Sequence, residues 1–268
     1  MKGRVRSALA GAAALMVLLA GCTGGGSESV RTSARATPAA TVAVPSAEVL
    51  AAALITPEDL PGDWTVQEIY DGESGSPDGQ EEELGQMLGF CGLAPAMSQA
   101  AAEAIQWTAG RVLDQTVENP LFDYDETKFS SEQDPSGHFV QAGEYLASGD
   151  QMQIEATFDA LRDGFLACWG DFGPSSEDQY TYTVQGLALP DVGDSRTGER
   201  TTGTWTSPAT GQTYRDISAR ALVRNGPVLI LVDLFQSSGG DGVAPLYTED
   251  EFAHLVADTV TTAVGKLP

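Results

Sequence analysis

The chain has 268 residues, with 38 acidic and 14 basic side chains, so its formal net charge at pH 7 is −24. A surface this negative repels nucleic acid and anionic lipid headgroups, which excludes a nucleic-acid partner. The length suits one fair-sized domain or two small ones.

The first 22 residues indicate a secreted, lipid-anchored protein. Basic residues at the start precede an uncharged run over 8–20, which is typical of a secretory signal and is too short for a membrane span. The end of the run, Leu19-Ala20-Gly21-Cys22, resembles the bacterial lipobox, in which the cysteine thiol takes a diacylglyceryl group and the new amine is usually acylated, for example with palmitate. We expect a lipoprotein signal peptide over 1–21, a membrane anchor through lipid on Cys22, and a location on the extracellular face of the cell membrane. An ordinary secretory signal that ends near a cysteine is the alternative.

Residues 22–45 predict a flexible, disordered tether. They are mostly Gly, Ser, Thr, Ala and Pro and include no aromatic residue. Such a segment buries too little apolar surface to offset its chain entropy. We therefore expect the folded, extracellular α+β domain to cover 46–268.

The N-terminal part of this domain alternates short helices and strands. Ser46 is placed to cap a helix, and Thr56-Pro57-Glu58-Asp59 predicts a further helical turn. A strand over 64–70 follows. The next predicted segments are a loop over 71–83, a short helix around 84–88, strands over 104–113 and 139–146, and a loop or edge strand over 123–126. Residues 100–104 are helical by propensity, which leaves the start of the 104–113 strand open.

The strongest helix pattern spans Gln151–Trp169. Its apolar side chains recur every three or four residues and form one stripe: Ile154, Phe158, Leu161, Phe165 and Cys168. A period-two pattern then predicts strands over 180–185, 196–206, 213–224 and 228–235. Asn225-Gly226 predicts a tight hairpin between the last two, and Thr248-Glu249-Asp250-Glu251 has capping-box spacing and opens a final helix.

This order of elements predicts an α+β fold with a single antiparallel sheet of about six to seven strands and helices packed on a face. Adjacent strands that are joined by tight turns pair in antiparallel fashion, and we expect a single domain.

Four segments resemble the extracellular sensor-like domains of actinobacteria, a family typified by the ectodomain of the mycobacterial kinase PknH and found in many free lipoproteins. They are residues 54–64 (LITPEDLPGDW), 167–169 (ACW), 189–195 (LPDVGDS) and 222–226 (LVRNG). The resemblance implies a sheet domain with a cleft, outside the membrane, that binds an unidentified ligand. We expect neither a kinase domain nor a transmembrane helix here, so signalling through an attached kinase is not implied.

One of the three cysteines is assigned to the lipid anchor, and the other two can pair with each other. Once Cys22 is lipidated, Cys91 and Cys168 remain. The compartment lies outside the reducing cytosol, and Cys168 belongs to the inner stripe of its helix. We predict a disulfide between Cys91 and Cys168; two buried thiols are the alternative.

No motif for catalysis, metal binding or a cofactor stands out. His138 and His254 are the two histidines, but the sequence has no Gly-x-Ser-x-Gly motif whose serine could be a nucleophile beside one of them. The acids of 123–126 lack a calcium-loop pattern. We expect surface histidines, no enzyme, no metal and no cofactor. Paired carboxylates of a glycoside hydrolase leave no sequence signature, and this alternative stays open.

Aromatic and arginine residues are the candidate ligand contacts. Converging aromatics would suit an apolar ligand, and guanidinium groups on a sheet face would receive an anion. Core filling and pairing with the protein's own acids are the alternatives. The candidates are Trp107, Trp205, Tyr180, Tyr182, Arg220 and Arg224.

We therefore expect a membrane-anchored, non-catalytic domain whose partner is a small molecule, a lipid or a wall fragment. Its cleft would be lined partly by the C-terminal strands. The alternative is a protein-interaction or scaffold module of the cell envelope without a small-molecule ligand.

Overall fold

The computed structural model describes residues 43–70, 96–117, 137–173, 180–206, 211–240 and 243–268. The predictions on Cys22, the tether up to residue 42, Cys91 and the segments 71–83, 84–88 and 123–126 lie outside these residues. Within the described ranges, no helix is both long enough and apolar enough to cross a membrane.

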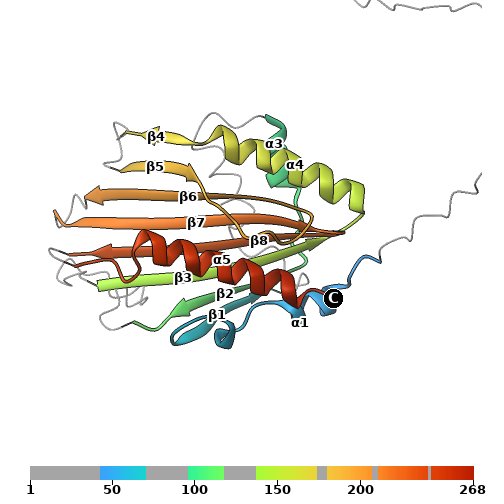
Figure 1. Ribbon diagram of the computed structural model, residues 1–268, viewed down its shortest axis with the longest axis horizontal. Helices are drawn as coiled ribbons and strands as arrows, with labels where there is room; N and C mark the ends of the chain where they lie inside the picture. The colour runs from blue at the N-terminus through green and yellow to red at the C-terminus, as the bar shows by residue number, and fades with distance from the viewer. Residues whose placement is uncertain (1–42, 71–95, 118–136, 174–179, 207–210, 241–242) are drawn as a thin grey trace, which may run out of the picture. The chain divides into compact units, whose positions relative to one another are not determined.

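Eight strands of the described chain form one antiparallel sheet in the order β1-β2-β3-β8-β7-β6-β5-β4 (Figure 1). The sheet consists of two meanders, β1 to β3 and β4 to β8, which join where β3 pairs with β8. This pairing begins with Gly137 opposite Gly239 and ends with Ser148 opposite Val228. The strands are β1 Trp64–Tyr70, β2 Ala109–Gln115, β3 Gly137–Ser148, β4 Gly170–Phe172, β5 Thr181–Gly186, β6 Ser195–Thr206, β7 Thr213–Asn225 and β8 Val228–Gly239. The predicted α+β fold with a single sheet is confirmed, but the sheet has eight strands rather than six to seven.

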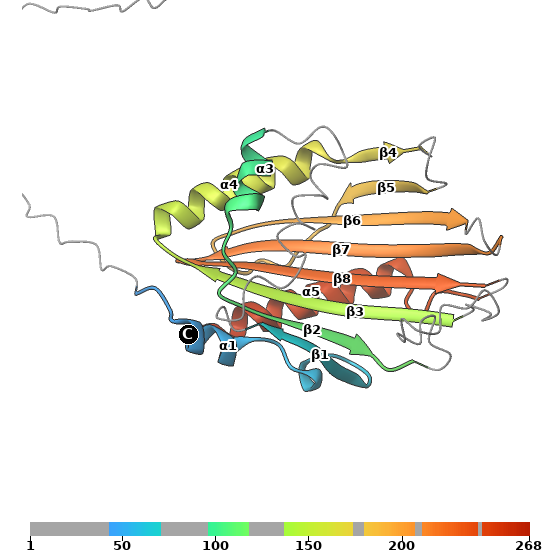
Figure 2. The same ribbon diagram turned by 180° about the vertical axis from the view of Figure 1, so that it is seen from behind.

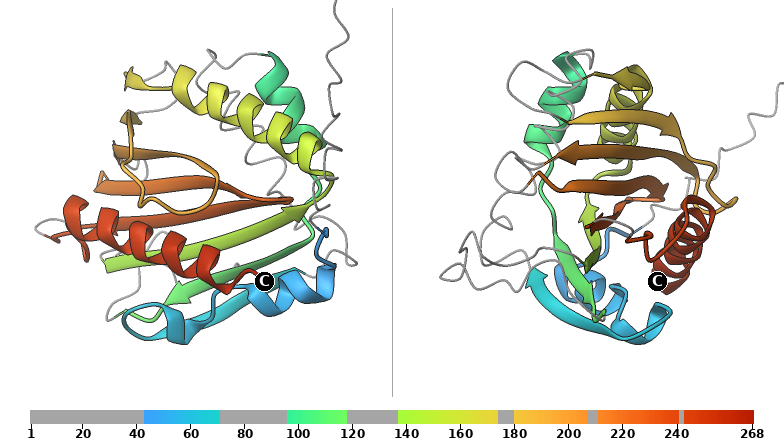
Figure 3. Two further views of the ribbon diagram at one scale, coloured as in Figure 1. Left: turned by 45° about the vertical axis from the view of Figure 1, so that its right-hand side comes forward. Right: turned by 90° about the vertical axis from the view of Figure 1, so that its left-hand side faces the viewer.

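Helices cover both faces of the sheet, whereas the sequence predicted helices on a face. Figures 1 and 2 show α5 and α1 on one face and α3 and α4 on the other, and the end-on view in Figure 3 separates the two layers. The described helices are α1 Ala47–Ala53, the 3-10 turn η1 Pro57–Asp59, α3 Ala96–Ala104, α4 Gln151–Ala167 and α5 Glu249–Lys266. Long helices at two separate points of the chain supply these two layers.

Each face of the sheet carries its own apolar core. On the α5 side, Phe252 and Val256 pack with even-numbered β8 residues such as Ile230. On the α4 side, Phe158 and Phe165 pack with odd-numbered β8 residues such as Leu231. This alternation explains why Val228 to Val232 is apolar at every position: β8 lies inside the sheet and is covered on both faces.

Most predicted helix ends are confirmed. Ser46 accepts a hydrogen bond from Val49 N at the start of α1, and Thr248 forms a capping box with Glu251 at the start of α5. The buried stripe of α4 is as predicted, and Cys168 follows its last residue, 6% exposed. Because Cys91 lies outside the described residues, the Cys91–Cys168 disulfide stays a prediction.

Two local predictions are wrong. The strand predicted over 104–113 is β2, which begins at Ala109, because the alanine-rich segment before it continues α3 to Ala104. In the β7–β8 hairpin, Asn225 pairs with Val228, so the loop residues are Gly226 and Pro227 rather than Asn225 and Gly226. Gly226, the first loop residue, has φ +57°, which glycine adopts readily. The second loop position of such a turn needs a negative φ, and proline fixes φ near −65°.

Candidate functional site

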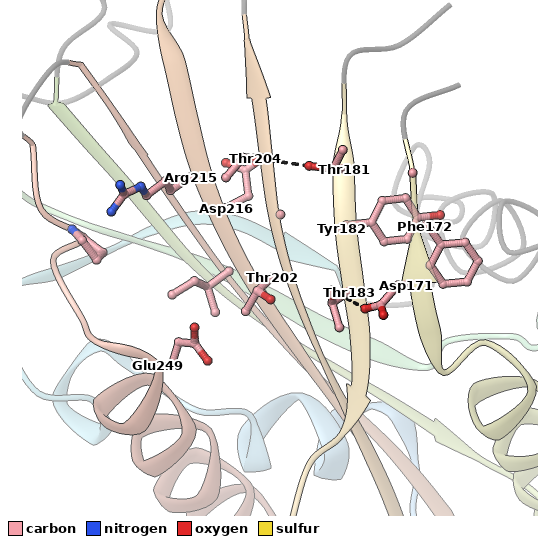
Figure 4. A pocket seen from close by; sticks show the side chains of 14 residues that line it. Asp171, Phe172, Thr181, Tyr182, Thr183, Thr202, Thr204, Arg215, Asp216 and Glu249 are labelled. Atoms are coloured by element: carbon pink, nitrogen blue, oxygen red, sulfur yellow. Dashed lines mark hydrogen bonds between the residues drawn. The ribbon is translucent and has the colours of Figure 1, made fainter. Parts of the chain in front are cut away.

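A hollow of about 530 Å³ lies on the α5 side of β5, β6 and β7 (Figure 4). Its floor carries the hydroxyls of Thr181 and Thr183 from β5 and of Thr202 and Thr204 from β6. Thr202 pairs across the sheet with Ile217, which belongs to the α5-side core. We call this site the threonine hollow, and its volume is within the range of ligand pockets.

Charged groups stand around the threonine hollow. Asp171 comes from β4, Arg215 from β7, and Glu249 from the first turn of α5; Figure 4 shows Glu249 reaching from the helix toward the strands. Glu249 forms an ion pair of 3.0 Å with Arg200 of β6, which fixes the start of α5 beside the hollow. Both charge signs and four hydroxyls therefore surround one open volume.

Cross-strand hydrogen bonds order part of this lining. The hydroxyls of Thr181 and Thr204 lie 3.1 Å apart, and Thr183 donates to Asp171 Oδ1 at 2.7 Å (Figure 4). β-branched threonine suits strands, and facing pairs of this kind stabilise them. The sequence prediction missed these residues, although Thr at every second position, 181 and 183 and again 202 and 204, was a visible signal of one hydroxylated face.

Three of the four predicted aromatic contacts gather on the opposite face of the same strands. Tyr180 stacks on Tyr182 with ring centroids 5.4 Å apart, and Trp205 stacks on Tyr214 at 4.5 Å. Trp107 is not with them: it is 3% exposed in the α4-side core, 5.8 Å from the Tyr145 ring. Filling the core is therefore the role of Trp107.

The predicted arginines are paired with the protein's own acids. Arg220 lies between Glu199 and Asp233, with nitrogen–oxygen distances of 3.9 and 3.5 Å. Arg224 Nη1 lies 3.2 Å from Asp194 Oδ2 at the hairpin. The idea of an open guanidinium cluster for an anion is wrong for these two residues.

Burial changes the acidity of several groups on the α4 side. It raises the pKa of Glu199 to about 7, and it also raises the pKa of Asp216, although a hydrogen bond from Ser237 Oγ opposes that shift. The pKa of Tyr180 rises to about 12 because the ring is largely buried and Asp216 is close. At neutral pH the tyrosine hydroxyl stays protonated.

The histidines are placed differently from each other. His254 is exposed on α5, as predicted, but His138 is half-buried, and its Nδ1 lies 3.1 Å from Ser238 Oγ across β3 and β8. Burial lowers the pKa of His138. In the described part of the chain no carboxylate contacts this ring, and no three His, Cys, Asp or Glu side chains come together as metal ligands.

No family model and no curated protein sequence matches the chain. Among solved structures, it is similar to the extracellular domain of PknH from Mycobacterium tuberculosis, with a TM-score of 0.39 and 13% identity over 82% of this chain and 97% of that one. LpqN of Mycobacterium tuberculosis, involved in cell envelope biogenesis, gives 0.25 and 10% over 58% and 68%. The lipid transfer and protein localization domain of human StarD13 gives 0.18 and 10% over 59% and 84%. At these values the likenesses carry no conclusion about family, ligand or location.

Proposed function

We propose that the protein is a cell-surface lipoprotein whose sheet domain binds a polar small molecule without transforming it. The observation that carries this proposal is the threonine hollow, about 530 Å³ in volume, beside the first turn of α5. The hollow lies on β5, β6 and β7, three of the C-terminal strands, and this location supports the proposal.

The lining favours a hydroxylated ligand. Threonine hydroxyls donate and accept hydrogen bonds, and Asp171, Glu249 and Arg215 offer charged partners around them. Sugars and the peptide-bearing glycans of a cell wall present matching groups. A purely apolar lipid would remove these polar groups from water without adding hydrogen bonds to them, at a cost in free energy.

The test is a thermal-shift screen of the mature chain, from residue 22 onward with Cys22→Ala, against wall glycan fragments, neutral sugars and lipids. A ligand at 100 times its dissociation constant stabilises the folded state by about 2.7 kcal/mol. Thr202→Val keeps the side-chain shape but removes a hydroxyl from the hollow, so we expect at least a several-fold loss of affinity for the ligand that the screen finds.

Thr197→Val is the matched control, because Thr197 lies on the same strand and pairs with Leu222 of the α4-side core. It should leave affinity unchanged. An equal loss of affinity in Thr202→Val and Thr197→Val would show that the threonine hollow is not the binding site. No shift with any class, together with turnover of a glycan or ester, would replace the binding function by a hydrolase, and no shift without turnover would favour a scaffold module.

A further inference from the structure

The strands that floor the threonine hollow carry a second surface on their α4 side, and three of its residues, Phe172, Tyr182 and Asp216, also border the hollow (Figure 4). Five rings line it in two stacks. In the first stack, Tyr182 lies between Phe172, with 4.7 Å between ring centroids, and Tyr180. In the second stack, Trp205 lies on Tyr214. We call these five residues the aromatic face. Tyr180, Tyr182 and Trp205 are only partly buried, so part of each residue meets solvent.

Glycine 203 positions the centre of this face. A Cβ atom at Gly203 would lie 2.5 Å from the Tyr180 hydroxyl, so that hydroxyl rests directly on the β6 backbone. Gly203 pairs with Asp216 of β7, which places the Asp216 carboxylate next to the Tyr180 hydroxyl. The electrostatic effects of Asp216 and Arg220 on the pKa of Tyr180 agree with this placement.

The carboxylate of Asp216 stands apart from the other charged groups on this side of the sheet. It lies at the level of Gly203, whereas Glu199, Arg220 and Asp233 form a separate group four residues farther along the strands. Among the described residues, no Lys or Arg forms an ion pair with Asp216. Aromatic rings attract organic cations through their π faces, so an organic cation suits a place beside this carboxylate.

Asp216 is the contact that a ligand would make. Ser237 Oγ donates to Asp216 Oδ1 at 2.6 Å, and this hydrogen bond holds the side chain and directs it to the α4 side. The register partner of Asp216 on β6 is Gly203, on which the Tyr180 hydroxyl rests, so the carboxylate lies on the same face as the rings. We propose that the aromatic face, with Asp216, binds a small molecule through a protonated amine, which approaches Asp216 Oδ2 while its hydrocarbon part lies against the rings. This site goes beyond the threonine hollow and takes the opposite charge from the anion that the arginines suggested.

The test compares benzylammonium with benzyl alcohol, its uncharged counterpart of nearly equal shape. Both are titrated into the mature chain, from residue 22 onward with Cys22→Ala, and followed by amide chemical shifts. We expect benzylammonium to bind at least about tenfold more tightly, and this ratio should fall as salt is raised. Amide shifts should concentrate on β5, β6 and β7.

Asp216→Asn keeps the acceptor for Ser237 and removes the charge. In this variant benzylammonium should bind no more than about threefold more tightly than benzyl alcohol, since only the ring contacts remain. The matched control is Asp171→Asn, because Asp171 lies on the opposite face in the threonine hollow. The control should keep the full ratio.

Glucosamine and hexylammonium then distinguish an amino sugar from an aliphatic amine as the source of the ammonium group. Equal affinity for benzylammonium and benzyl alcohol would overturn the proposal, as would a ratio that Asp216→Asn leaves unchanged. Loss of the ratio in Asp171→Asn alone would move the amine to the threonine hollow and overturn this site. The hollow is tested with neutral glycans and Thr202→Val, so either site can fail without the other.

Discussion

Two glutamates, Glu144 on the α5 side and Glu199 on the α4 side, are almost completely buried in the sheet. Glu144 Oε2 accepts a hydrogen bond from Ile55 N at 2.5 Å, and Arg111 Nη1 donates to Ile55 O at 2.6 Å, so these side chains hold the segment after α1 against β2 and β3. Burial raises the pKa of each glutamate from 4.5 to about 7. Both are therefore sites where stability depends on pH.

The direction of that dependence follows from proton binding. Below about pH 4.5 both states hold the proton, and above about pH 7 neither does. Between these values the unfolded chain releases a proton that the folded chain keeps, so the free energy of unfolding falls as pH rises. Each shift amounts to about 3 kcal/mol, as an order of magnitude.

Glu199→Gln and Glu144→Gln should therefore flatten the fall in stability between pH 5 and pH 7.5, each by a part of that amount. Urea unfolding at the two pH values measures the effect. Glu48→Gln is the control, since Glu48 is exposed on α1 and should keep the wild-type pH dependence. A glutamine variant with an unchanged slope would show that its carboxyl ionises normally in the folded state.

At the scale of elements, the loop from Leu189 to Ser195 is fastened to the β7–β8 hairpin. Asp194 N donates to Arg224 O at 2.7 Å, and Asp194 Oδ2 accepts from Gly226 N at 2.8 Å. These contacts join two of the segments that resemble the sensor-like domains, 189–195 and 222–226. Arg224 therefore has a structural role at the hairpin, and its predicted ligand contact is not supported.

Gly193 makes this close approach possible. Its φ is +67°, and a Cβ would lie 2.6 Å from Val223 Cγ1 and 2.7 Å from the carbonyl oxygen of Arg224. Gly193→Ala should lower the free energy of unfolding by about 2–4 kcal/mol, from the left-handed conformation and from the clash with backbone. Gly211→Ala is the control: φ is +73° with nothing within 4 Å, so we expect a loss of about 1–2 kcal/mol. Equal losses in urea unfolding would contradict the clash.

The sequence predicted those elements whose signal is long and local. The buried stripe of α5, from Phe252 to Ala263, is as predicted because eighteen residues of helix repeat one period several times. The three residues of β4 are too few to show a period, so the strand count came out low. The threonine hollow depends on which strands become neighbours and on where the start of α5 packs against the sheet, and no local pattern states either.

At the scale of the whole domain, the described chain begins beside its own C-terminus, at the end of α5. The threonine hollow lies at the start of the same helix. Ala43, Val44, Leu267 and Pro268 line one small groove, and Lys266, in the last turn of α5, bonds Asp59. Glu249 borders the hollow at the other end of this helix, whose 18 residues span about 27 Å. The first described residue and the threonine hollow therefore lie toward opposite ends of α5.

We predict that anchoring and ligand binding are independent of each other. We expect Cys22→Ala to abolish both partition with membranes and labelling by palmitate analogues, because the predicted lipid on Cys22 is the anchor. The same variant should keep the thermal midpoint and ligand affinity of the lipidated protein, since Cys22 is outside the folded elements that carry both candidate sites. Ser27→Ala, also in the predicted tether, is the matched control and should stay in the membrane fraction. If Cys22→Ala still fractionates with membranes, the lipoprotein assignment is wrong, whereas a loss of ligand affinity in that variant would tie binding to the bilayer rather than to the sheet.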